Sequence, residues 1–212
     1  MIAGALNFDE LNALVAHKRA VPYEEYFGDM DLTEREVEER IGLAEELESK
    51  ILPVMVLLFL MQLYGEMDWQ QIEDDLYDAY YSAMVGYMTI DQRMEEHMRE
   101  VAQEIVQSTQ EHMDDPYYFS EDRAQFIAEN ETNTSLEYRD FSRATQAGKT
   151  LKTWRDMRDK RVRETHARVG GTTKPIWEPF QVGDYLMMFP KDDSLGAGPE
   201  ECINCRCHAS YS

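Results

Sequence analysis

The sequence has few cysteines and few cations, and these shortages exclude several classes of protein. Only three of its 212 residues are cysteine, too few for a small disulfide scaffold. Lysine and arginine total 21 against 42 acidic residues, which gives a net charge of −21. Because phosphate binding needs clustered cations, a chain of this charge is a poor general ligand for nucleic acids or anionic membranes. A hydrophobic content of 43% nevertheless supports a folded core in one domain or a small pair.

Targeting signals and long apolar runs are also scarce. The first residues (MIAGALNFDELNAL) show no basic stretch followed by an apolar run, so we expect no signal peptide. The most apolar stretch, residues 51–63, contains Pro53 and Gln62 and is shorter than the roughly 20 apolar residues that span a bilayer. We therefore expect a buried helix there, synthesis in the cytoplasm and no membrane partner.

Charge divides the chain into two unlike parts. Residues 1–120 hold 27 acidic and 7 basic residues, whereas the remainder holds 15 and 14. The predicted regions are an acidic helical region at 1–118, connecting helices at 119–148 and a separate module at 149–212.

Helical periodicity dominates the acidic part. Apolar residues recur every four positions on one face, and three capping patterns precede periodic runs. The recurring residues are Leu43, Leu47, Ile51, Met55, Phe59 and Leu63, and the capping pairs are Thr33 with Glu36, Asp68 with Gln71, and Thr89 with Gln92. Three amphipathic helices with short connections predict a bundle.

The pattern changes after residue 115. Pro116 should end the third helix and Ser120 should cap the next, and a further helix is expected from about 133 to 147. Beyond Gly148 the sequence predicts one helix over 159–169 and several short extended segments. The expected fold class is α+β, with a predominantly helical N-terminal region followed by a small C-terminal module with short strands and one helix.

All three cysteines lie in the last eleven residues. In an extended chain, Cys205 and Cys207 point to one face and Arg206 to the other. With His166 they would supply the sulfur and nitrogen ligands that Zn²⁺ takes in a tetrahedral site. Possible zinc binding therefore stands beside two alternatives, a disulfide and buried free thiols. Cys202 is an accessory position.

An ordered motif runs through the same part of the chain. It reads W-x4-D-x3-R-x2-H, then a glycine at 170 or 171, a phenylalanine, a Pro190 loop (PKDD) and the ending ECINCRC. Its residues are Trp154, Asp159, Arg163, His166, Phe180, Asn204, Cys205, Arg206 and Cys207. This segment resembles the C-terminal module of the phage Mu F-like head morphogenesis proteins, also called phage minor head proteins. The resemblance reaches back weakly to residues 120–132 and leaves the helices before 115 unmatched, so it covers less than half of the chain.

The resemblance implies a structural component of a tailed phage or prophage. Such proteins are made in the host cytoplasm, reside in the virion head near the portal, and bind the portal and other capsid proteins. Since no catalytic motif is identified, we expect no enzyme. An alternative is a hydrolase or nuclease, metal-dependent or metal-free, that uses His166 and Asp159.

Asp159, Arg163 and His166 form a polar row in the motif, and three roles stay open for it. Asp159 and Arg163 at i and i+4 would form an intrahelical ion pair if the segment is helical. His166 would then share their face, as part of a structural hydrogen-bond network, a metal site or a catalytic centre.

A basic band gives the second half its own charge pattern. Residues 149–174 carry nine bases against three acids. The candidate phosphate contacts are Lys149, Lys152, Arg155, Arg158, Lys160 and Arg161, which would make the chain an accessory DNA-binding protein of the head. The band would equally pair with the acidic first half, and we favour this alternative because the local concentration of acids is high.

Overall fold

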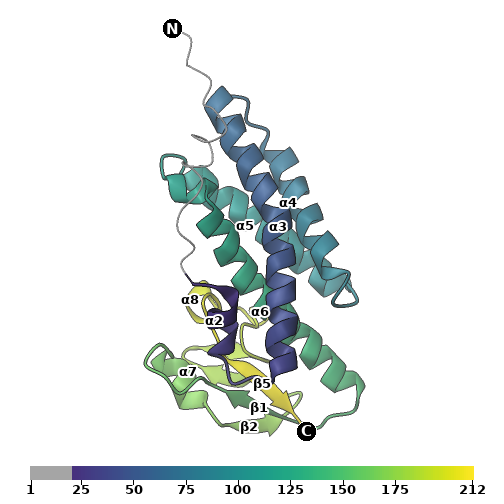
Figure 1. The fold of residues 1–212 in the computed structure, drawn as a ribbon. Helices are drawn as coiled ribbons and strands as arrows, with labels where there is room; N and C mark the ends of the chain where they lie inside the picture. The colour runs from purple at the N-terminus through teal and green to yellow at the C-terminus, as the bar shows by residue number, and fades with distance from the viewer. Residues whose placement is uncertain (1–20) are drawn as a thin grey trace. The chain divides into compact units, whose positions relative to one another are not determined.

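The computed structural model describes residues 21–212, which divide into two compact units (Figure 1). The helical unit contains residues 42–128, and the C-terminal unit contains residues 23–41 and 129–212. The helices are α2 (Tyr23–Gly28), α3 (Glu34–Tyr64), α4 (Trp69–Met84), α5 (Gln92–Glu111), the 3-10 helix η1 (Pro116–Phe119), α6 (Glu121–Gln146), α7 (Glu164–Val169) and α8 (Pro199–Cys202). The strands are β1 (Leu151–Arg155), β2 (Thr173–Pro175), β3 (Phe180–Val182), β4 (Tyr185–Met187) and β5 (His208–Tyr211). The expected α+β class is confirmed, and the expectations for the first residues lie outside the described part.

The helix starts follow side-chain caps. Thr33 and Glu36 form the predicted capping box, in which the Glu36 carboxylate accepts from the Thr33 backbone N–H at 2.8 Å. Asp68 caps α4 as predicted, accepting from the Gln71 N–H at 3.1 Å. The prediction for α5 was wrong, because Asp91 rather than Thr89 is the cap. Aspartate is among the most favoured N-cap residues, and Asp91 lies directly before the helix, where its side chain accepts from the Met94 N–H.

The helical unit is built on apolar stripes. Along α3 the predicted face is buried through Met55 and becomes more exposed at Phe59 and Leu63. This helix continues through Pro53 without ending. α4 and α5 pack against each other, and each has a buried apolar face that includes Ile72 and Leu76 on α4 and Met94 and Met98 on α5.

One helix of the described residues could span a membrane by length and composition alone. In α3, an 18-residue window has a mean hydropathy of 1.5, and 33% of that window is buried. The expectation from residues 51–63 considered only the most apolar run, whereas the helix that contains it is 31 residues long. Core helices of soluble proteins meet the same criterion.

In the C-terminal unit, β1 is the central strand of a three-stranded antiparallel sheet ordered β2-β1-β5. Trp154 on β1 pairs with Ala209 on β5, and Thr153 pairs with Thr173 on β2. β3 and β4 form a separate hairpin. The sheet therefore brings the chain's last strand directly beside the strand that carries the motif tryptophan.

Two predicted helices have other bounds in the structure. The expected break near residue 133 is absent, because α6 is a single helix from Glu121 to Gln146. Conversely, residues 159–163 are not helical: the Asp156 and Asp159 carboxylates accept from the backbone N–H groups of Arg158 and Arg161. Such local side-chain bonds compete with a helix, so α7 begins only at Glu164.

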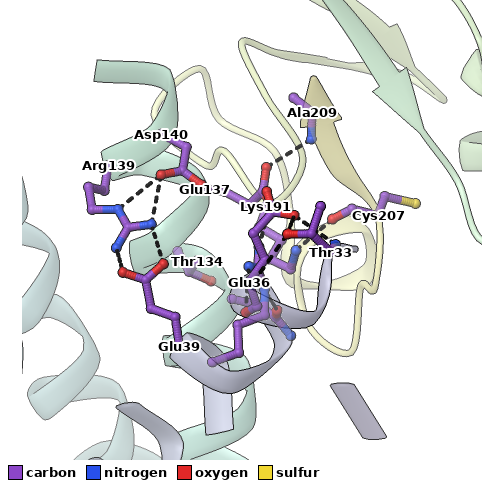
Figure 2. A network of polar contacts seen from close by, with 12 residues as sticks. Thr33, Glu36, Glu39, Thr134, Glu137, Arg139, Asp140, Lys191, Cys207 and Ala209 are labelled. Carbon is purple, nitrogen blue, oxygen red and sulfur yellow. Dashed lines mark hydrogen bonds and ion pairs between the residues drawn. The ribbon is translucent and has the colours of Figure 1, made fainter. Parts of the chain in front are cut away.

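The division into units also differs from the expected boundaries at 118 and 148. A buried ion pair explains part of this difference: Arg40 at the start of α3 lies 3.0 Å from Glu137 on α6. Glu137 also accepts from the Ala209 backbone N–H at 3.0 Å, and Arg139 on α6 pairs with Glu39 (Figure 2). These contacts place the first turns of α3 with the strands rather than with the helical unit.

Candidate functional site

The sequence motif converges on one buried cluster of the C-terminal unit. Trp154 is fully buried and packs edge-to-face on the His166 and Phe180 rings, with centroid distances of 5.4 and 5.3 Å. Cys205 and Cys207 belong to the same apolar core. The tryptophan therefore packs against one side of a site whose polar groups are an imidazole and two thiols.

His166 is held between a carboxylate and the two sulfurs. Its Nε2 lies 2.8 Å from the Glu201 carboxylate. Its Nδ1 lies 3.4 Å from the Cys205 Sγ and 3.5 Å from the Cys207 Sγ. Because an ionised carboxylate only accepts, this pairing places the imidazole proton on Nε2 and leaves the Nδ1 lone pair facing the thiols.

Two glycines end the short helix that carries His166. A Cβ at Gly170 would lie 2.1 Å from the Asp156 carboxylate, so no other residue fits without a shift. Gly171 has a φ of +79°, in the left-handed region that glycine adopts without strain. Both glycines of the motif therefore serve the turn after α7.

The cysteines converge because the tail bends before β5. Asn204 adopts a φ of +57°, a conformation in which asparagine is enriched. Its backbone N–H donates to the Asn130 side chain on α6 at 2.7 Å. Cys205 and Cys207 then face His166, while Arg206 turns to Asp159 at 2.6 Å. The predicted division of faces is present, although these residues precede the strand rather than lying within it.

The pKa values of the Cys205 and Cys207 thiols depend on each other. A hydrogen bond between the sulfurs lowers the pKa of Cys205 well below its ordinary value, and the same bond raises the pKa of Cys207. Lys191 is buried nearby and its ammonium favours the charged form of both thiols. It also donates to the Cys207 carbonyl at 2.8 Å (Figure 2). The cluster can therefore hold negative charge on sulfur despite its burial.

A small cavity adjoins the cluster. His166, Cys205 and Cys207 line it together with Met157, Val162, Arg163, Asn204 and others, and its volume is about 20 Å³. That volume accommodates about one water molecule.

The predicted polar row is divided between different partners. Arg163 directly precedes α7 and its side chain donates to the Ile203 carbonyl, so the expected intrahelical pair with Asp159 was wrong. Asp159 bonds Arg206, and His166 bonds Glu201. The catalytic pairing of His166 with Asp159 is therefore not the arrangement that the structure shows.

Three residues of the site were missed from the sequence. These are Glu201, which fixes the imidazole, Lys191 beside the sulfurs, and Asn130, which holds the tail turn. Glu201 begins the ECINCRC segment, so the motif itself contained a signal for it. Lys191 is likewise the lysine of the PKDD loop in the motif, whereas Asn130 shows no spacing that distinguishes it from surface residues.

The basic band divides into exposed and buried members. Lys152 is fully buried and donates to the Met188 carbonyl at 2.6 Å. Burial lowers the pKa of Lys152 to about 8. Its predicted phosphate contact is therefore wrong. Exposed members of the band are Lys149, Arg155, Arg158, Lys160 and Arg161.

One exposed base follows the alternative that we favoured. Arg161 lies 2.6 Å from Asp29, which belongs to the acidic first half of the chain. Arg155, in contrast, donates to the Ser210 hydroxyl.

Comparison with known proteins gives one match. The family model described as phage Mu protein F like protein matches residues 70–210. The match begins in α4, so the resemblance extends well upstream of the segment expected from the motif. Amphipathic helices carry a periodicity but few distinctive residues, which explains why no motif was visible there. No curated protein and no solved structure matches the chain significantly.

Proposed function

Because this chain belongs to the phage Mu protein F-like family, a family of structural proteins of phage head morphogenesis, we propose that it is a minor head protein that binds the portal. The observation that carries the proposal is the family match over residues 70–210. Interaction with other capsid proteins follows from membership of the family. The portal as direct partner, and the virion head near it as location, are the finer parts of the proposal.

The helical unit offers a surface for such a partner. The second half of α3, residues 51–64, is apolar, yet Leu63 and Tyr64 at its end are 49% and 70% exposed, and Val56 and Leu60 are only partly buried. Exposed apolar stretches on a folded chain commonly mark sites of protein association. We assign Val56, Leu60, Leu63 and Tyr64, called here the α3 apolar stripe, to contact with another head protein.

A hydrolase has less support from the geometry. A catalytic centre needs space for a substrate beside its nucleophile or base. The cavity at His166 has room for about one water molecule, and both neighbouring thiols are 3% exposed. A structural role for the cluster fits this enclosure better than turnover does.

Particle composition tests the proposal. Assembled heads, purified and analysed by mass spectrometry, should contain the chain at few copies, and affinity capture of the chain should recover the portal. Absence of the chain from assembled particles would overturn the structural role. Recovery of other capsid proteins without the portal would overturn the choice of partner.

A pair of variants tests the surface. Leu63→Lys combined with Tyr64→Lys should reduce portal recovery, because each change places a cation on the α3 apolar stripe. Trp177→Lys is the matched control, since Trp177 is also 70% exposed but lies in the C-terminal unit. Equal recovery with both proteins would remove the α3 apolar stripe from the interface.

A further inference from the structure

We propose that His166, Cys205 and Cys207 form a zinc site, with a water molecule as the fourth ligand. The imidazole Nδ1 and the two sulfurs all lie within 4.8 Å of one another. Two cysteines and a histidine with one open position are a known ligand set for Zn²⁺. The proposal concerns an ion held by this chain and does not depend on the portal as partner.

The distances agree with tetrahedral coordination. Zinc bonds of about 2.3 Å to sulfur and about 2.05 Å to nitrogen, at the tetrahedral angle, separate the two ligand atoms by about 3.6 Å. The observed separations from Nδ1 are 3.4 Å to Cys205 and 3.5 Å to Cys207. One lone pair on Nδ1 can accept only one well-aligned S–H bond, so the equal approach of both sulfurs fits a shared ion better than a hydrogen bond.

The hydrogen bond on the other ring nitrogen of His166 is also typical of a metal site. Histidine ligands of metals generally donate their other ring N–H to a carboxylate or carbonyl, which fixes the ring. Glu201 takes this position at 2.8 Å from Nε2 and is itself held by the Thr165 hydroxyl at 2.9 Å. Glu201 is thus a positioning residue and not a ligand.

Charge and space are consistent with the ion. Two thiolates neutralise Zn²⁺, so the bound ion would leave no uncompensated charge among the three buried ligands. The cavity of about 20 Å³ is lined by all three ligand residues and has room for the fourth ligand as one water molecule. Cys202 is not part of the converging group among residues 21–212.

Metal analysis of the full chain tests the site. Protein purified with reductant and zinc should contain about one zinc ion per chain, and cobalt substitution should give the charge-transfer absorption of two thiolate ligands. Cys205→Ser combined with Cys207→Ser should lose the metal, whereas the matched control Cys202→Ser should keep it. Metal-free protein that takes up no cobalt would overturn the site, and loss of zinc from Cys202→Ser would overturn the three-ligand assignment.

A milder variant keeps the test valid if the double variant fails to fold. Glu201→Gln leaves all three ligands in place and should weaken zinc affinity about 10- to 100-fold, measured by competition with a chromophoric chelator. Unchanged affinity would remove Glu201 from its positioning role. Zinc binding with no portal recovery would leave this site intact and refute only the proposed partner.

Discussion

Different interactions stabilise the interior of each of the two units. In the helical unit the buried side chains are mostly apolar, as in the packing of Leu47, Leu76 and Met98. In the C-terminal unit, buried polar and charged groups are common, among them Arg40, Glu137, Lys152, His166, Lys191, Glu201 and Arg206. Apolar packing tolerates substitution by residues of similar volume. Buried polar groups do not, because each depends on one particular partner.

The largest effect is expected from breaking the buried ion pair of the C-terminal unit. Burial raises the pKa of Glu137 to about 7, so above that pH Arg40→Ala leaves a buried carboxylate without its guanidinium, which typically costs about 3–5 kcal/mol. Chemical denaturation of the purified chain measures the loss. Replacing both partners, with Arg40→Met and Glu137→Leu, should recover much of the stability, and a double variant as unstable as Arg40→Ala would contradict the account.

A cavity in the helical unit should have a slightly smaller effect. Leu76 on α4 is 2% exposed, so Leu76→Ala should cost about 3 kcal/mol. Leu76→Met keeps the volume and should cost less than about 1.5 kcal/mol. Equal losses for the two variants would show that volume does not decide stability in this unit.

A buried carboxyl group, Glu137, should make the stability of the C-terminal unit depend on pH. Burial raises the pKa of Glu137 to about 7, although Lys191 and Arg40 act to lower it and Asp140 adds to the increase. Between pH 4.5 and about 7 the folded state therefore retains a proton that the unfolded state has released, so stability falls as pH rises through this window.

Glu137→Gln removes this contribution. Relative to the unchanged chain, the variant should gain stability progressively towards neutral pH, by up to about 3 kcal/mol. Urea unfolding at a series of pH values measures the difference. A constant difference across the window would show that Glu137 keeps the same protonation in both states.

The exposed bases should have the smallest effect. Lys149 and Lys160 are exposed, but the chain carries a net charge of −21. We expect no retention of DNA in filter binding at physiological salt, and no change on Lys149→Ala with Lys160→Ala. Retention that weakens steeply with salt, and weakens further in this variant, would assign the band to phosphate contact.

The same contrast explains how far the sequence predicted the structure. In the helical unit, period and caps predicted α3, α4 and their starts, because packing there follows a repeated pattern. In the C-terminal unit the sequence predicted short extended segments after Gly148 and the division of faces between Arg206 and the two cysteines on either side of it. It did not predict Glu201 as the partner of His166, since that contact joins residues 35 positions apart.

Local chemistry accounts for the wrong helix at 159–163. Asp156 and Asp159 carry side chains that bond their own backbone, and this effect competes with helical spacing. The sequence also did not predict the burial of Lys152, because a lysine within a basic band has the pattern of an exposed residue. The pattern therefore leaves two things undetermined: the long-range polar contacts and the exact bounds of some helices.

Hydrogen exchange of the full chain, with zinc and after chelation, tests most directly the claim that a metal-centred polar cluster holds the C-terminal unit while apolar packing holds the other. The account predicts that chelation lowers protection in β1, α7 and β5 and leaves α4 and α5 unchanged. Identical exchange in both conditions, or an equal loss of protection in both units, would contradict it.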